Sequence, residues 1–245
     1  MRRERKSRGL GYFLAELLIL VVGISASFAL NEWRIERQES RQEVELLENF
    51  KANLAIDSLT LFSGSKQLKT QVENAQKVLL SDGNTPLDSL LIPVISLLNY
   101  VPFNSNDITY QQMRGTGTVS LIKNDSLASR IIGLYENDFE ILTTWTQIDA
   151  EHVRGRLIPH VEENFPFTVG LQYSQASRAI QREFISQVQQ DEFKHLVQFG
   201  LSYKSSTRAY FEAVLKDIRE TIELINQELS TSQKASDQES ISPDR

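Results

Sequence analysis

The most pronounced feature of the hydrophobic pattern is an apolar run from Leu10 to Leu30, in which Glu16 is the one charged residue. With a rise of ~1.5 Å per residue, a helix over this run would extend roughly 31 Å, close to the ~30 Å hydrocarbon core of a bilayer. Tyr12 and Trp33 stand near its two ends, where aromatic rings favour the membrane interface. The pattern predicts a transmembrane helix over residues 10–30, with Tyr12 and Trp33 as anchors in the lipid bilayer.

Beyond this run, apolar residues recur at intervals of three and four, which is typical of amphipathic helices. Residues 31–62 contain neither Gly nor Pro. One stripe of this interval consists of Leu47, Phe50, Leu54 and Leu61, with Asp57 as a polar interruption. We therefore expect the membrane helix to continue outward as a stalk, to break at Gly64 and to be followed by a second helix over 66–80.

Turn signals divide the residues that follow. The polar sequence from Ser81 to Pro86 predicts a turn, and Pro86 is tolerated at the start of a short apolar helix over 87–98. Residues 101–124 are less regular. This part of the chain is thus expected to contribute one short helix and an irregular connection.

A long helix is expected from Asn124 or Asp125, either of which can cap its first turn, to about residue 164. Its expected buried stripe is Leu127, Ile131, Leu134, Ile141, Trp145 and Ile148. Residues 165–170 are predicted to form a loop, and two further helices are predicted over 176–189 and 192–229. The last has the most regular heptad spacing in the chain, formed by Phe211, Leu215, Ile218, Ile222, Ile225 and Leu229.

No segment alternates apolar and polar residues over the length of a strand. The predicted fold class is all-α, with an N-terminal transmembrane helix that continues into a stalk and an antiparallel extracytoplasmic helical bundle. The predicted domains are a cytoplasmic basic head (1–9), the transmembrane helix (10–30), the bundle (31–229) and a polar tail (230–245) that we expect to be disordered.

The distribution of charge along the chain predicts its orientation across the membrane. Of the 26 basic and 32 acidic residues, five basic and two acidic ones precede Asn31, which leaves 21 and 30 and a net charge of −9 for the remainder. Short basic segments stay in the cytoplasm, so the bulk of the chain is expected outside it. A domain with this net negative charge is unsuited to binding nucleic acid, because binding phosphate groups requires a basic surface.

A cleaved signal peptide is the alternative to an anchor. Ser27-Phe28-Ala29 has the small-x-small pattern of a cleavage site behind a basic segment and an apolar run. The length of the apolar run, the acidic Glu16 within it and helical periodicity that continues past the cut favour the anchor.

Three residues of the apolar run are candidates for contact with another membrane helix. Glu16 and Gly23 are seven residues apart and share a face, and Gly23 with Ser27 has the small-x-x-x-small spacing that lets helices approach closely. The partner would be a second copy or another membrane protein. The alternative is that Glu16 merely reaches the headgroups or is protonated.

The candidate chemistry is sparse. With no Cys, thiolate metal sites and cysteine nucleophiles are excluded. His152 and His160 lie eight residues apart rather than at the i, i+4 spacing that binds zinc, and the third histidine is His195. His152 and Asp138 share the apolar stripe but are separated by roughly 21 Å along a helix. We therefore predict no metal, no cofactor and no catalytic residue.

Other patterns favour ordinary structural roles. Arg114-Gly-Thr-Gly-Thr118 is either a plain turn or an anion-binding nest, and it lacks the Gly-Lys-Ser/Thr ending of a phosphate loop. The acidic pairs Glu162-Glu163 and Asp191-Glu192 lie near predicted helix ends, where they cap or are solvated. The C-terminal half contains aromatic residues that fill the core or line a pocket between helices, of which core is the better interpretation: Phe184, Phe193, Phe199, Tyr203, Tyr210 and Phe211.

Two segments resemble a known family of bacterial membrane proteins, domain of unknown function 6090. Residues Glu16 to Trp33 are similar to its N-terminal signature of a Glu, an apolar run with Gly-Ile, then Ala-Leu and a closing Asn-x-Trp. Residues Thr109 to Asn124 are similar to its Tyr…Gly…Leu-Ile-Lys-Asn stretch. Ser25 and Ser27 depart from the usual aliphatic residues. The resemblance implies a membrane-anchored helical protein of the bacterial inner membrane, with the C-terminal domain in the periplasm, and no particular activity.

Two functions remain open from the sequence. The first is a non-enzymatic extracytoplasmic module that binds a protein or senses a small ligand near the membrane. The second is a cell-envelope enzyme of hydrolase type with an unrecognised site, although no Gly-x-Ser-x-Gly elbow is present.

Overall fold

The computed structural model describes residues 10–166 and 175–241, and every regular element in these ranges is helical, which confirms the predicted all-α class. The elements are α1 (Leu10–Leu80), α2 (Leu87–Leu97), α3 (Ile108–Thr116), η1 (Thr118–Leu121), α4 (Asp125–Gly133), η2 (Leu134–Asp138), α5 (Phe139–His152), η3 (Val153–Leu157), α6 (Ile158–Asn164), α7 (Arg178–Val188) and α8 (Asp191–Ile241).

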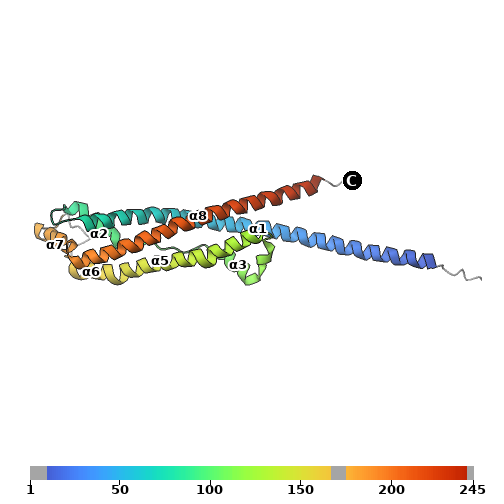
Figure 1. Cartoon of the computed structure of the whole chain (residues 1–245), viewed down its shortest axis with the longest axis horizontal. Helices are drawn as coiled ribbons and strands as arrows, with labels where there is room; N and C mark the ends of the chain where they lie inside the picture. The colour runs from blue at the N-terminus through green and yellow to red at the C-terminus, as the bar shows by residue number, and fades with distance from the viewer. Residues whose placement is uncertain (1–9, 167–174, 242–245) are drawn as a thin grey trace, which may run out of the picture.

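Helix α1 is a single element of 71 residues (Figure 1). The predicted break at Gly64 is therefore wrong. Gly64 is buried within the helix, at a point where the ring of Phe211 in α8 packs directly against the α1 backbone. Glycine is retained here because it has no side chain to separate the two helices, and this contact compensates for its low helix propensity.

The N-terminal part of α1 is not buried against the other described elements. All positions from Tyr12 to Glu39 are exposed, including the entire apolar run. By length and composition α1 contains one candidate membrane span, and none of that span is buried against the rest of the protein. The predicted apolar helix over 10–30 is thus present as part of α1.

The distal half of α1 packs mainly along α8, and the two helices lie side by side in Figure 1. The predicted stripe of Leu47, Phe50, Leu54 and Leu61 is fully buried. From α8, Phe211, Leu215, Ile218 and Ile225 are buried in the same core, which confirms that the heptad stripe is the packing face. A second core cluster lies around α2, α7 and the first turns of α8, with Phe165, Phe184 and Phe193 at its centre.

Elements α4 to α6 follow one another without a loop, as expected for the long helix. Asn124 caps its start by accepting a hydrogen bond from the Leu127 N–H at 3.1 Å. Two π-helical turns, η2 and η3, interrupt the α-helical geometry. A π turn accommodates an extra residue and so rotates every later side chain about the helix axis.

This rotation overturns part of the predicted stripe. Leu127, Ile131 and Leu134 precede η2 or begin it and are buried as expected. After η2 the buried positions are each one residue later than predicted, at Leu142, Thr146 and Asp149. The predicted Ile141, Trp145 and Ile148 are exposed or half-buried instead.

The ends of two predicted segments also differ. Helix α8 continues to Ile241, so the polar residues 230–241 are helical rather than disordered, and 242–245 lie outside the described residues. Of the loop predicted over 165–170, Phe165 and Pro166 follow the end of α6, and the rest lies outside the described residues. Beyond their shared contact, the N-terminal part of α1 and the C-terminal part of α8 diverge (Figure 1).

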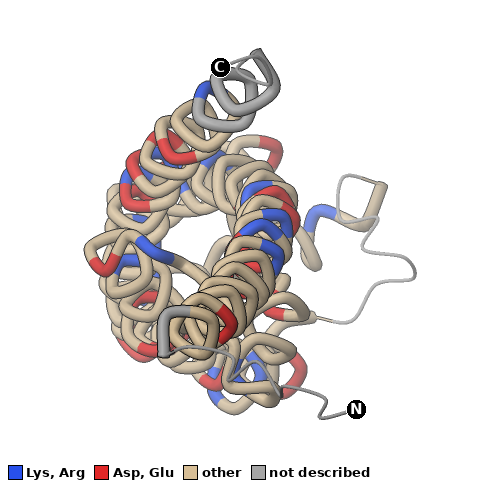
Figure 2. The backbone as a smooth tube through the Cα atoms, turned by 90° about the vertical axis from the view of Figure 1, so that its right-hand side faces the viewer, with Lys and Arg blue, Asp and Glu red and all other residues tan. Residues whose placement is uncertain are grey.

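Outside the apolar run of α1, charged residues of both signs are distributed over the described helices. Viewed along the long axis in Figure 2, Lys and Arg are interspersed with Asp and Glu over the described helices. A site that depends on charge must therefore be sought in local arrangements of side chains.

Candidate binding site on the seam between α5 and α8

The side chains that η2 rotates outward lie beside a second row of aromatic residues on α8. We call the two rows together the aromatic seam. Its members from α5 are Ile141, Trp145 and Ile148, and its members from α8 are Phe199, Tyr203 and Tyr210. Phe199 is 58% exposed, Ile141 45% and Tyr210 37%, so the seam presents apolar surface to solvent.

Ring contacts hold the seam together across the two helices. The rings of Trp145 and Tyr210 stack with centroids 5.4 Å apart and an interplanar angle of 24°. Tyr203 stacks on Phe199 at 6.4 Å and meets the ring of His152 edge-on at 5.3 Å. Paired aromatic rings are rigid and have few rotatable bonds, so this surface is ordered before any partner arrives.

A pocket of about 370 Å³ opens at the distal end of the seam. It is lined by Ile148, Glu151, His152, Arg156, Leu196, Phe199 and Tyr203. Glu151 and Arg156 are exposed and supply one charge of each sign beside the apolar lining. The pocket combines apolar walls with a few polar groups, which is the usual composition of a recognition site.

His152 fixes the floor of this pocket. Its Nε2 lies 2.9 Å from the Leu196 carbonyl oxygen, and because a carbonyl can only accept, Nε2 is the protonated nitrogen. Burial lowers the pKa of His152, while this hydrogen bond and the charge of Asp149 oppose the shift. The imidazole is therefore neutral, and its Nε2 is occupied by a contact that joins α5 to α8.

Beneath the seam lies a buried ion pair. Lys204 Nζ donates to both carboxylate oxygens of Asp149, at 3.1 and 3.0 Å, and to the Asn99 carbonyl at 2.8 Å. Both side chains are 1% exposed. Burial raises the pKa of Asp149 and lowers that of Lys204, and their mutual attraction opposes both shifts. The pair ties α5, α8 and the connection after α2 into one unit.

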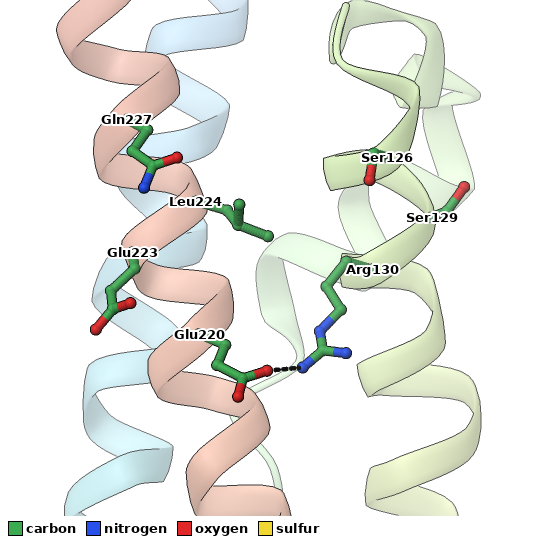
Figure 3. Close-up of a pocket in the computed structure, with 7 residues that line it drawn as sticks. All are labelled: Ser126, Ser129, Arg130, Glu220, Glu223, Leu224 and Gln227. Atoms are coloured by element: carbon green, nitrogen blue, oxygen red, sulfur yellow. Dashed lines mark hydrogen bonds and ion pairs between the residues drawn. The ribbon is translucent and has the colours of Figure 1, made fainter.

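A second hollow, of about 590 Å³, lies between α4 and α8 (Figure 3). It is lined by Ser126, Ser129, Arg130, Glu220, Glu223, Leu224 and Gln227. Arg130 donates to Glu220 Oε2 at 2.9 Å and to Asp217 Oδ1 at 2.8 Å, which neutralises the one cation in this lining. This arrangement is a bridge between two helices and offers a ligand little apolar contact.

The predicted membrane-contact residues are all exposed on α1. Ser27 Oγ donates to the Gly23 carbonyl at 2.9 Å, so the hydroxyl is already satisfied within the helix. Gly23 has no heavy atom of another element within 4 Å of the position a β-carbon would take. Glu16 is exposed on the same helix. Tyr12 and Trp33 are 55% and 49% exposed at the two ends of the apolar run.

The three histidines have different surroundings. His160 is buried and stacks on Phe193 with ring centroids 5.8 Å apart, whereas His195 is exposed on α8. Burial raises the pKa of Asp138, the other polar residue of the predicted stripe. Within the described residues, no three His, Asp or Glu side chains form a metal-binding group.

Of the aromatic residues predicted to lie in the core, some are buried and others are exposed. Phe184, Phe193 and Phe211 are buried, while Phe199 and Tyr210 are exposed. The sequence does carry a signal for this second row. Phe199, Tyr203 and Tyr210 are spaced four and seven apart, beside the heptad stripe rather than on it. A helix with two apolar stripes has more apolar surface than one neighbour covers.

Comparison of the chain with protein-family models, curated proteins and solved structures finds no match. The resemblance of residues Glu16 to Trp33 and Thr109 to Asn124 to a membrane-protein family therefore stays a prediction.

Proposed function

We propose that this protein is a membrane-anchored, non-enzymatic interaction module that binds another protein through the aromatic seam. The observation that carries the proposal is the partial exposure of two facing rows of apolar side chains on rigid helices. Contiguous exposed apolar surface on a folded protein is typical of interaction sites.

The proposed arrangement places the seam outside the cytoplasm. Residues 10–30 of α1 cross the bacterial inner membrane, the basic residues before them stay in the cytoplasm, and an antiparallel bundle stands in the periplasm. The exposed apolar surface of α1 and the excess of basic residues before it support this orientation.

A protein segment suits the seam better than a small molecule. The seam follows two helices over several turns. Its α5 members recur at spacings of four and three and its α8 members at four and seven, which match the anchors of an amphipathic helix laid into a groove. The pocket at His152 would receive one larger side chain of that segment. Aromatic anchors of this kind dominate the energetics of protein interfaces.

An envelope enzyme is less well supported by the chemistry of the seam. His152 Nε2 donates to the Leu196 carbonyl, and the carboxylate of Asp149 is held by Lys204 below the surface. The protonated ring nitrogen and the carboxylate are thus both engaged in holding helices together. Neither His152 nor Asp149 is therefore placed as a general base beside a nucleophile in the pocket.

A second contact is proposed within the membrane. Glu16, Gly23 and Ser27 would face another membrane helix, from a second copy or another membrane protein, because a carboxyl group and small residues on one lipid-facing surface favour helix pairing. This contact would pass the binding state of the periplasmic bundle to a partner.

In vivo photo-crosslinking tests the seam. A photoreactive phenylalanine analogue would be placed at Trp145 or Phe199, with Lys216 of α8, exposed and away from the seam, as the matched control. We expect a discrete protein adduct from both seam positions and none from Lys216. Absence of adducts at both seam positions in native membranes, or equal adducts at Lys216, would contradict the proposal.

A further inference from the structure

The segment of α1 just beyond the apolar run has its charges sorted by face. Arg34, Arg37 and Arg41 recur at i, i+3 and i+7 and therefore share one face of the helix. On roughly the opposite face, at ~100° per residue, is a row of acidic residues: Glu32, Glu36, Glu39 and Glu43.

The acidic row faces the rest of the protein. Glu43 is buried, and its Oε1 accepts a hydrogen bond from the Lys123 N–H at 2.7 Å. Glu36 and Glu39 line a groove between α1 and the C-terminal part of α8, together with Lys123 and Glu228, and Arg37 and Arg41 line the α1 edge of the same groove. Arg34, Arg37 and Arg41 are nevertheless all exposed to solvent.

The three arginines are not neutralised by carboxylates. None of them forms an ion pair with any described residue, although Glu45 lies one turn beyond Arg41 on the same side. Arg37 lies over the ring of Trp33, 5.2 Å from its centroid. Trp33, Arg34, Arg37, Gln38 and Arg41 surround an open hollow of about 530 Å³. The three cations are therefore available to an anion from outside the chain.

The height of the arginines identifies that anion. At ~1.5 Å per residue, the Cα atom of Arg34 lies about 6 Å, that of Arg37 about 10 Å and that of Arg41 about 16 Å beyond Leu30 along the axis. The headgroup layer of a bilayer begins where the hydrocarbon core ends and is roughly 5–8 Å thick. Side chains on a helix lean toward its N-terminus, so all three guanidinium groups lean toward the membrane.

We propose that Arg34 and Arg37 bind the phosphate groups of phospholipids in the outer leaflet of the membrane that α1 spans, and that Arg41 attracts the same anionic surface from just beyond them. Guanidinium groups bind phosphate oxygens in a bidentate manner, and Trp33 supplies the interfacial ring beside them. The inference rests on the proposed membrane span. It assigns to the arginine row a role in fixing the height and rotation of α1, distinct from the binding of a protein at the seam.

Lipid binding to the full chain tests the proposal. The purified protein in neutral detergent would be titrated with phosphatidylglycerol, and bound lipid would be counted by native mass spectrometry. The test variant is R34Q/R37Q/R41Q, and the matched control is R178Q/R182Q/R219Q, which removes three exposed arginines elsewhere. At about fivefold per arginine near an anionic surface, we expect the test variant to bind at least tenfold more weakly and the control to bind as wild type.

Two further experiments distinguish lipid from free phosphate as the ligand, and failure of this inference from failure of the proposed membrane span. Inorganic phosphate at millimolar concentration should not displace the lipid; displacement would mean that free phosphate is the ligand and would overturn the lipid assignment. Equal lipid binding by both variants would also overturn it. Extraction of membranes with alkaline carbonate measures the span separately: loss of wild-type protein from the membrane refutes the proposed anchor, whereas retention with unchanged lipid binding refutes this inference alone.

Discussion

Phe211 packs so closely on Gly64 that a β-carbon added to the glycine would lie 2.5 Å from Phe211 Cε1 and 3.0 Å from Val101 Cγ1. Phe211 is itself fully buried and also packs edge-on against Phe103, at 6.1 Å between ring centroids. The ring therefore has little room to move aside, and Gly64 sets the separation of α1 and α8.

The first prediction concerns this contact. Gly64→Ala should destabilise the fold by about 1–3 kcal/mol through overpacking, despite the better helix propensity of alanine. Gly133→Ala is the control, since no heavy atom lies within 4 Å of the position its β-carbon would take, and it should be neutral or stabilising by up to ~1 kcal/mol. Chemical denaturation followed by circular dichroism measures both. A neutral Gly64→Ala would show that the helices can separate without cost.

The second prediction concerns the ion pair beneath the seam. Lys204→Met alone leaves the Asp149 carboxylate buried without a partner and should cost about 3–5 kcal/mol. The double variant Lys204→Met/Asp149→Leu removes both charges and should recover most of that loss. A double-mutant cycle of unfolding free energies measures the coupling; additive effects of the two substitutions would contradict an energetically coupled pair.

The third prediction is a pH dependence. Burial raises the pKa of Asp57 to about 6, a hydrogen bond from the Asn106 N–H opposes the rise, and the charge of Asp107 adds to it. Its Oδ2 is buried without a hydrogen-bond partner. Between pH 3.8 and about 6 the folded state thus binds more protons than the unfolded state, so the contribution of Asp57 to stability falls as pH rises through this window.

Asp57→Asn removes that titration. The variant should gain about 3 kcal/mol over wild type at pH 7.5 and about 1 kcal/mol at pH 4.5. Thermal unfolding of both proteins across this range gives the difference. A gain that is the same at both pH values would mean that the carboxyl does not titrate in the folded state as described.

Topology gives the fourth prediction. A reporter active only in the periplasm, fused after Arg245, should be active in the full-length protein, and a reporter active only in the cytoplasm should be silent. The physical reason is the cluster of basic residues before the apolar run. The reverse pattern would refute both the orientation and the periplasmic location of the seam.

The fifth prediction addresses the proposed membrane helix, residues 10–30 of α1. Glu16→Leu and Gly23→Leu should each reduce crosslinking of α1 to a neighbouring membrane helix. Glu16→Leu removes a hydrogen-bonding group, and Gly23→Leu places a large side chain where the two helices would approach closely. Ile19→Leu, on the same apolar run, is the control. Unchanged insertion, abundance and crosslinked species in both variants would leave the segment as an anchor only.

Much of the fold could be predicted because periodicity reports local geometry. The stripe of Leu47, Phe50, Leu54 and Leu61 predicted one buried helix face, and all four residues are fully buried. The cap at Asn124 was predictable for the same reason, since its hydrogen bond to Leu127 spans only three residues. Such features depend on neighbours in the chain.

The features that escaped prediction depend on contacts between distant residues. Gly64 is a helix breaker in isolation, and only Phe211, far along the chain, makes glycine the residue that fits there.

The π turn at residues 134–138 has no sequence signature in the periodicity, because the apolar spacing continues through it unchanged. The seam was therefore predicted as core, although Trp145 faces outward after the turn.

Because α1 is a single unbroken helix, a change in its tilt moves its distal end over a large distance. Leu80 lies about 75 Å beyond Leu30 along the axis at ~1.5 Å per residue, and α2 and α7 sit at that distal end (Figure 1). Membrane helices adopt tilts between about 0° and 40°, and for a rod of this length a change of ~10° moves the far end sideways by roughly 13 Å. In the proposed arrangement, a slight change in bilayer thickness or in the neighbour of Gly23 is thus magnified into a displacement larger than the width of a helix.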